Sequence, residues 1–226
     1  AHVAIIALSA TVSNAEEFGA WIREVRSTCE IIVSEKRPVP LYQHMIVGED
    51  IFDLYAPTGK GKLNPELVAA TRDSGMRGGR GSRSWNREVR VRRESRPSTL
   101  ISLDRARLLP AITFIFSRAG CEDAVRQVLS TRITLTTRSE AAEIESYVDE
   151  VIALLPPEDA IVLGAEAWKR GLMRGIAAHH AGMLPLMKES VEHLFSRGLV
   201  KMVYATETLA LGINMPARTV VIESLT

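Results

Sequence analysis

Short apolar runs alternate with amphipathic segments along most of the chain, and this alternation limits the possible folds more than any other feature. Runs such as HVAIIAL and AITFIFS are continuous and rich in β-branched residues, which is typical of strands buried on both faces of a parallel sheet. The segments between them place apolar residues at helical spacing. The order strand, helix, strand, helix predicts an α/β fold with a parallel sheet flanked by helices.

The predicted strands lie at residues 2–8, 30–34, 111–117, 199–206 and 219–224, and residues 175–182 are predicted as a short strand that passes into a loop. The predicted helices lie at residues 14–26, 65–72, 119–132, 139–155, 158–173 and 184–198. In such a sheet, ligands bind beyond the carboxyl ends of the strands, so we expect the chemistry in the loops that follow these runs.

Two stretches interrupt the alternation. Pro38 and Pro40 favour extended backbone, which predicts a connector over residues 36–48. Residues 72–97 are rich in Gly, Ser and Arg and poor in residues that form a core, which predicts a disordered insertion. This insertion is either a solvated variable loop or an electrostatic arm for phosphates, with Trp85 available for stacking on a base.

Charge and cysteine content exclude several classes of protein. The chain has 28 Lys and Arg against 27 Asp and Glu, so net charge gives no sign of a nucleic-acid or membrane partner. No apolar run is long enough to cross a bilayer. Cys29 and Cys121 lie far apart, which favours a reduced, cytoplasmic setting over a disulfide framework. The chain begins inside an apolar run without an initiator Met, which indicates the middle of a longer protein.

The stretch APTGKGKLN at residues 56–64 looks like a damaged phosphate-binding loop. Such a loop needs a hydroxyl after its Lys to hold Mg²⁺, but Leu63 follows Lys62. Pro57 removes one backbone donor, and Pro65 begins a helix only three residues after the Lys. We therefore interpret the stretch as a surface loop.

Small polar residues follow the predicted strands. Ser9 and Thr11 follow the first, and Ser117 and Arg118 lie at the end of the strand at 111–117. A further group lies at or beyond the ends of the later runs, namely His179, His180, Gly182, Thr206, Glu207, Gly212 and Asn214. Short hydroxyls, an amide and backbone N–H groups suit contacts with phosphate and ribose. Taken singly, each also has a structural explanation, such as a helix cap at Ser9 to Thr11. Adjacent His residues on a strand point to opposite sides, so we predict no metal site at 179–180.

In order along the chain, LSAT, FIFSR, HHAGMLP and TETLALGINMPA resemble motifs of the superfamily 2 DExH-box helicases, in the superkiller-like branch that includes HelY-like proteins. The resemblance covers nearly the whole chain apart from the Arg-rich insertion. It implies residues 1–35 as the end of a first RecA-like domain, 36–48 as the connector, and 49–226 as an incomplete second RecA-like domain. The resemblance also implies that the phosphate loop and the metal-binding carboxylates precede residue 1.

The resemblance also implies roles for individual residues. Ser9 and Thr11 would couple the state of ATP to domain position, and Gly212 and Asn214 would face the nucleotide. Contacts with nucleic acid would come from Thr206, Ser117, Arg118, His180 and Gly182. The implied cofactors are ATP and Mg²⁺, whose ligands lie outside this stretch, and the implied partner is a single-stranded nucleic acid, with RNA favoured over DNA.

Two other functions stay open from the residues alone. One is a non-catalytic Rossmann-like module that binds nucleic acid through the Arg-rich tract, which would make the helicase motifs coincidences. The other is a small nucleotide-using enzyme, which would need its own phosphate loop and metal-binding carboxylates.

Overall fold

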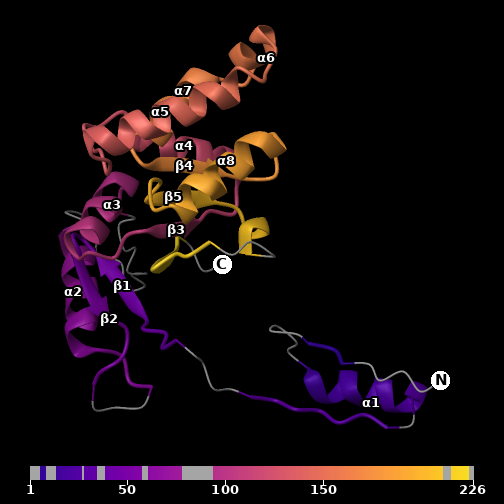
Figure 1. Cartoon of the computed structure of the whole chain (residues 1–226). Helices are drawn as coiled ribbons and strands as arrows, with labels where there is room; N and C mark the ends of the chain where they lie inside the picture. Colours follow the sequence, from indigo (N-terminus) through magenta and orange to yellow (C-terminus); the bar gives the residue numbers. More distant parts are fainter. Residues whose placement is uncertain are drawn as a thin grey trace. The chain divides into compact units, whose positions relative to one another are not determined.

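The chain forms two compact units in the computed structural model, Ala1–Tyr42 and Gln43–Thr226 (Figure 1). The structure describes residues 6–8, 14–26, 28–34, 39–57, 61–77, 94–210 and 215–223.

One helix, α1 (Ala15–Arg26), organises the described part of the first unit. Its apolar residues follow the predicted spacing, and the rings of Phe18 and Trp21 lie 5.8 Å apart, centroid to centroid. The side chain of Ile31 packs directly on Gly19, where a side chain on the helix would collide with it. The predicted helix at 14–26 is therefore confirmed.

The two strands predicted in this unit are not seen among its described residues. Residues 6–8 are not in a strand, and Ile6 and Leu8 are 84% and 92% exposed, while residues 1–5 lie outside the description. Residues 30–34 are also not in a strand, and Ile32 is 85% exposed. An apolar run becomes a strand only when a neighbouring strand pairs with it, and no strand is described in this unit to do so.

The second unit begins with a hairpin that was not predicted from the sequence. Strands β1 (His44–Val47) and β2 (Asp50–Asp53) pair antiparallel, and Gly48 takes a positive φ of 67° in the turn between them. Helix α2 (Pro65–Arg77) packs on both strands. The end of the predicted connector at 36–48 is thus a strand, because its alternating side chains find a partner across a tight turn.

The edges of the predicted insertion at 72–97 belong to helices. Helix α2 continues to Arg77, and α3 (Arg96–Arg105) begins at Arg96, with Ser95 as its N-cap. Residues 78–93 lie outside the described residues, so the prediction of disorder there stays a prediction. Helix α3 holds the hairpin, because the Ser102 hydroxyl donates to the carbonyl of Glu49 over 2.9 Å.

A four-stranded parallel sheet forms the body of this unit, in the order β4-β5-β3-β6. Its strands are β3 (Ala111–Phe114), β4 (Ile176–His179), β5 (Met202–Ala205) and β6 (Thr219–Ile222). The remaining helices are α4 (Arg118–Leu129), α5 (Arg138–Ile152), α6 (Pro157–Val162), α7 (Ala165–Met173) and α8 (Pro185–Ser196). The predicted α/β fold is confirmed.

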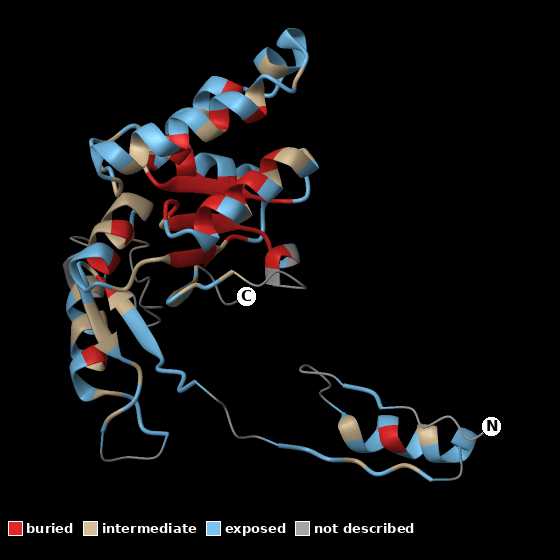
Figure 2. Cartoon of the chain, viewed as in Figure 1, coloured by how far each residue is buried: buried red, intermediate tan, exposed pale blue. Residues whose placement is uncertain are grey.

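The hydrophobic core has two layers because alternate residues of each strand face opposite sides of the sheet. Ala177 and Val203 face a cluster built with α5, α7 and α8. Ala178 and Tyr204 face a second cluster built with α3 and α4. Figure 2 shows β4 and β5 as buried along their whole length, whereas the edge strand β6 is partly exposed.

Glycines end α8 and separate α6 from α7. Gly198 follows α8 with a φ of 71°, as predicted for the end of that helix. The helix predicted at 158–173 is instead two helices, α6 and α7, because Gly164 between them takes a φ of 65°. Within the described ranges, none of the helices combines the length and apolar character that spanning a membrane requires.

Candidate nucleic-acid interface

Three neighbouring strands bring predicted site residues to the same edge of the sheet. Because β4, β5 and β3 are adjacent and parallel, their carboxyl ends lie side by side. His180 follows β4, Thr206 follows β5, and Ser117 lies three residues beyond β3. The Thr206 N–H donates to the carbonyl of His179 over 3.3 Å, so the first two strand ends are directly connected.

Ser117 is the N-cap of α4. Its hydroxyl accepts a hydrogen bond from the Gly120 N–H over 3.2 Å, with extended backbone at φ −152° and ψ 128°. Arg118 is then the first residue of the helix. The N-terminal turn of a helix carries partial positive charge, so Arg118 adds its guanidinium to an end that already favours anions.

His180 connects this helix to the loop after β4. Its Nδ1 accepts a hydrogen bond from the Gly182 N–H over 3.1 Å. A nitrogen that accepts carries no proton, so the ring proton is on Nε2, which donates to Glu122 Oε1 over 2.8 Å. The ring is buried, with the His180 side chain 8% exposed.

Gly182 leaves room for two of the other predicted residues. A Cβ at this position would lie 3.2 Å from Nδ1 of His180 and 3.5 Å from Cδ of Arg118. The absence of a side chain therefore allows the ring and the arginine stem to approach the same turn. The structure brings Arg118, His180 and Gly182 together.

His179 faces the other side of the sheet. Its Nε2 lies 2.7 Å from Glu192 Oε1 on α8, whereas His180 contacts Glu122 on α4. The adjacent histidines thus point to opposite faces, as predicted, and do not share a ligand. No group of three or more His, Cys, Asp or Glu side chains within the described ranges is arranged to hold a metal ion.

Thr206 lies at the predicted edge but is buried, at 8% exposure. Its carbonyl accepts from the Leu209 N–H over 3.1 Å, which begins the short 3₁₀ helix η1 (Glu207–Ala210). Four other predicted site residues lie outside the described residues: Ser9, Thr11, Gly212 and Asn214.

The described ends of the stretch at 56–64 pair with each other. The Ala56 N–H donates to the carbonyl of Lys62 over 2.9 Å, and Tyr55 and Leu63 form an antiparallel bridge. The loop joins β2 of the hairpin to α2, so it does not follow a strand of the parallel sheet. This arrangement agrees with the interpretation of the stretch as a surface loop.

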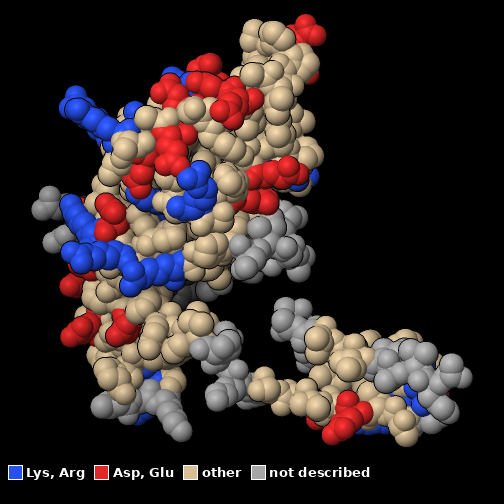
Figure 3. All heavy atoms as spheres, in the orientation of Figure 1, with Lys and Arg blue, Asp and Glu red and all other residues tan. Residues whose placement is uncertain are grey.

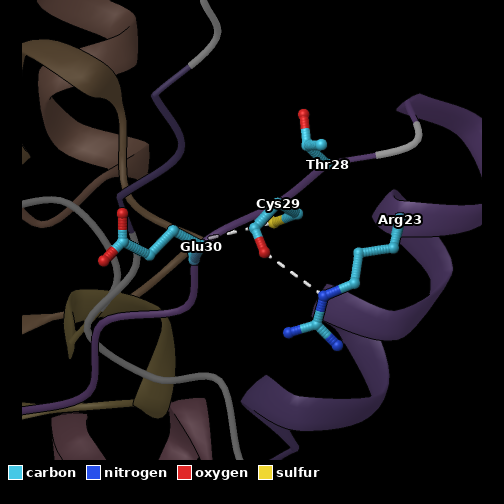
Figure 4. Close-up of a pocket in the computed structure, with 4 residues that line it drawn as sticks. All are labelled: Arg23, Thr28, Cys29 and Glu30. Atoms are coloured by element: carbon cyan, nitrogen blue, oxygen red, sulfur yellow. Dashed lines mark hydrogen bonds between the residues drawn. The ribbon is translucent and has the colours of Figure 1, made fainter.

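A shallow depression in the first unit lies apart from these residues in the sequence. It is lined by Arg23, Thr28, Cys29 and Glu30 (Figure 4). The Nε of Arg23 donates to the carbonyl of Cys29 over 3.2 Å, so the basic group that faces this depression is already used in holding the chain after α1.

Two groups near the sheet edge were not predicted from the sequence. Glu122 lies one helical turn after Arg118 on α4. Residues four apart share a helix face, so this spacing could have indicated that Glu122 lies on the same face as Arg118. Glu223 follows β6 and forms a two-point ion pair with Arg96, with Nε to Oε1 at 2.8 Å and Nη2 to Oε2 at 3.1 Å. The hydrogen bond to Glu223 raises the pKa of Arg96. No local pattern signals a contact over this separation.

Charge is unevenly distributed over the second unit. Residues 138–173, which include α5, α6 and α7, carry eight carboxylates against three basic side chains. Figure 3 shows acidic atoms gathered over these helices. A polyanion is repelled by such a surface.

Comparisons with known proteins give the same assignment over nearly the whole chain. The chain is 48% identical to a protein named probable helicase HelY from Mycobacterium leprae, over 99% of the chain and 26% of that relative. It is 41% identical to the DExH-box ATP-dependent RNA helicase DExH15, chloroplastic, of Arabidopsis thaliana, over 99% of the chain and 21% of that relative.

A third relative is superkiller complex protein 2 of Mus musculus, with 37% identity over 99% of the chain and 19% of that relative. No family model matches the chain. The chain spans about a quarter or less of the length of these curated relatives. Over the segment that it covers, the chain belongs to the superkiller-like branch of the superfamily 2 DExH-box helicases, which includes HelY.

Proposed function

We propose that this chain is part of an ATP-dependent helicase or translocase that acts on a single-stranded nucleic acid, with RNA as the favoured substrate. The observation that carries the proposal is identity of 37–48% to named helicases along 99% of the chain. DExH15 is an RNA helicase by name, which favours RNA over DNA. We also place the protein in the cytoplasm, in keeping with its two free thiols.

The carboxyl edge of the parallel sheet is the proposed nucleic-acid contact. Thr206, Ser117, Arg118, His180 and Gly182 would face the strand there, through a guanidinium, hydroxyls and backbone N–H groups. Such groups bind phosphates and position the strand without reading its sequence. The Gly182–Arg118 approach and the Thr206–His179 hydrogen bond support a single joined surface.

ATP with Mg²⁺ is the proposed energy source, bound between two RecA-like domains. Gly212 and Asn214 would face the nucleotide, and Ser9 and Thr11 would couple the state of ATP to the position of the domains. The phosphate loop and the metal ligands would come from parts of the parent protein other than these 226 residues. A non-catalytic binding module is disfavoured, because it would make the extended identity to helicases a coincidence.

The test uses the full-length parent protein with Thr206→Ala and Asn214→Ala. Loss of one hydrogen bond to a charged phosphate should weaken binding of a labelled single-stranded RNA about ten- to a hundredfold in Thr206→Ala, for every sequence tested. Asn214→Ala should slow ATP turnover while RNA affinity stays close to that of the parent. Anisotropy titration and phosphate release measure the two effects.

Thr134→Ala is the control for the threonine variant. Thr134 precedes the segment that binds Lys201 and Met173, at the amino ends of the strands, so it lies at the opposite edge of the sheet. Thr134→Ala should bind RNA like the parent.

A parent that neither binds single-stranded nucleic acid nor hydrolyses ATP contradicts the proposed function. If Thr206→Ala keeps its affinity and Asn214→Ala loses it, the two roles are reversed.

A further inference from the structure

We propose that Glu122 is a positioning residue of the nucleic-acid interface, which acts by holding His180 in one tautomer and one orientation. This inference rests on the proposed function of the sheet edge. It concerns a residue that carries no motif of its own and was identified from its contact with His180.

The two hydrogen bonds of the His180 ring leave one arrangement of its protons. The Gly182 N–H donates to Nδ1, so Nδ1 is an acceptor and the ring proton is on Nε2. Nε2 therefore donates, and its acceptor is Glu122 Oε1. If the ring flipped by 180°, Cδ2 would replace Nδ1 and Cε1 would replace Nε2, and both bonds would be lost. Glu122 therefore fixes the ring plane from the side of α4, and Gly182 fixes it from the side of the loop.

The consequence reaches Arg118. Gly182 lies against both the His180 ring and the Arg118 stem, as the 3.2 Å and 3.5 Å approaches to its missing Cβ indicate. Glu122 and Arg118 both belong to α4, one turn apart. The bond from Glu122 to His180 thus anchors the loop after β4 to the helix that presents Arg118, and it sets the distance between two groups of the proposed interface.

The charge of Glu122 and its contact with His180 predict opposite effects on RNA binding when the side chain is removed. The Glu122 side chain is 51% exposed, and a carboxylate next to a nucleic-acid contact repels phosphates. Removing this charge should tighten RNA binding if the carboxylate only contributes to the local field. If Glu122 holds His180, its removal should weaken binding. The sign of the change separates the two roles.

Asp123 offers a matched control on the same helix. Its side chain is also 51% exposed, and it pairs with Arg126, not with the histidine. Asp123→Ala removes the same unit of charge from α4 and leaves the His180 contact in place. It should therefore leave RNA affinity unchanged or slightly raise it.

The experiment measures the dissociation constant of a labelled single-stranded RNA for the full-length parent, together with the RNA concentration that half-maximally stimulates its ATPase. Glu122→Ala should raise both values about three- to tenfold, as expected for loss of one hydrogen bond. Glu122→Gln keeps an acceptor oxygen without the charge, so it should restore both values to those of the parent or below. Glu122→Ala should add no further loss in a His180→Ala background, because both changes remove the same contact.

Each outcome decides the inference. Glu122→Ala that binds RNA as well as Asp123→Ala does, or an equal loss in Glu122→Gln and Glu122→Ala, overturns the positioning role. Additive losses in the double variant also overturn it. A parent that binds no RNA at all contradicts the proposed function itself, whereas a parent that binds RNA while the Glu122 and Asp123 variants behave alike contradicts only this inference.

Discussion

At the scale of single residues, burial beside the sheet sets the chemistry of the side chains. Cys121 on α4 is completely buried, and this burial raises the pKa of its thiol to about 11. Burial also raises the pKa of Tyr204 on β5. A thiol reacts as its thiolate, so Cys121 is protected both by its surroundings and by its protonation.

We therefore expect iodoacetamide at pH 8 to modify Cys29, which is partly exposed, and to spare Cys121 in the folded chain. A raised pKa favours the protonated thiol, so the thiolate of Cys121 forms only as the pH approaches about 11. Mass spectrometry of tryptic peptides measures the two sites. Denaturant should make them react alike, and equal rates without denaturant would contradict the burial of Cys121.

Which residues matter at the edge was only partly predictable. Ser117, Arg118, His180 and Gly182 were predicted because they follow apolar runs, and parallel strands end at the same edge. Glu122 was not predicted, because a carboxylate on an amphipathic helix resembles any solvated residue until the fold places His180 against it.

At the scale of elements, the Arg96–Glu223 ion pair joins the start of α3 to the end of the edge strand β6. The two side chains are only 17% and 16% exposed. Removing one partner of such a pair leaves the other charge poorly solvated. This contact closes one end of the sheet beside the proposed interface.

Arg96→Ala should lower the free energy of unfolding by about 2 kcal/mol, less than the loss from a fully buried pair. The urea midpoint, followed by circular dichroism, measures the change. Arg105→Ala is the control, since its partner Glu49 and Arg105 itself are 72% and 67% exposed. An exposed pair contributes at most about 1 kcal/mol. Equal shifts for the two variants would show that the buried geometry has no special weight.

Elements were predicted best where a run pairs with neighbours inside the same unit. The parallel strands and the helices around them agree with their apolar patterns. The hairpin at 44–53 was missed, because Pro38 and Pro40 dominated the interpretation of that stretch and its strands are half-exposed. The division at Gly164 was also missed, since a glycine inside a helical pattern signals a break only when its φ is known.

At the scale of the whole molecule, the 226-residue chain alone should not hydrolyse ATP. Its one Gly-Lys loop lies in the turn between β2 and α2, away from the strands of the parallel sheet. Phosphate release with and without RNA measures turnover, and Lys62→Ala should change nothing. Turnover that disappears in Lys62→Ala would contradict the interpretation of residues 56–64 as a surface loop.

The narrowness of the sheet edge has a consequence for ionic strength. Strands lie about 4.8 Å apart, so three strand ends extend about 10 Å and meet only two or three phosphates. Each neutralised phosphate of a single strand releases about 0.7 of a counterion. A fourfold rise in salt would then weaken the binding at this edge only about tenfold, against a thousandfold or more for proteins that contact many phosphates. The edge would keep hold of a strand at salt concentrations that release it from a broad basic surface.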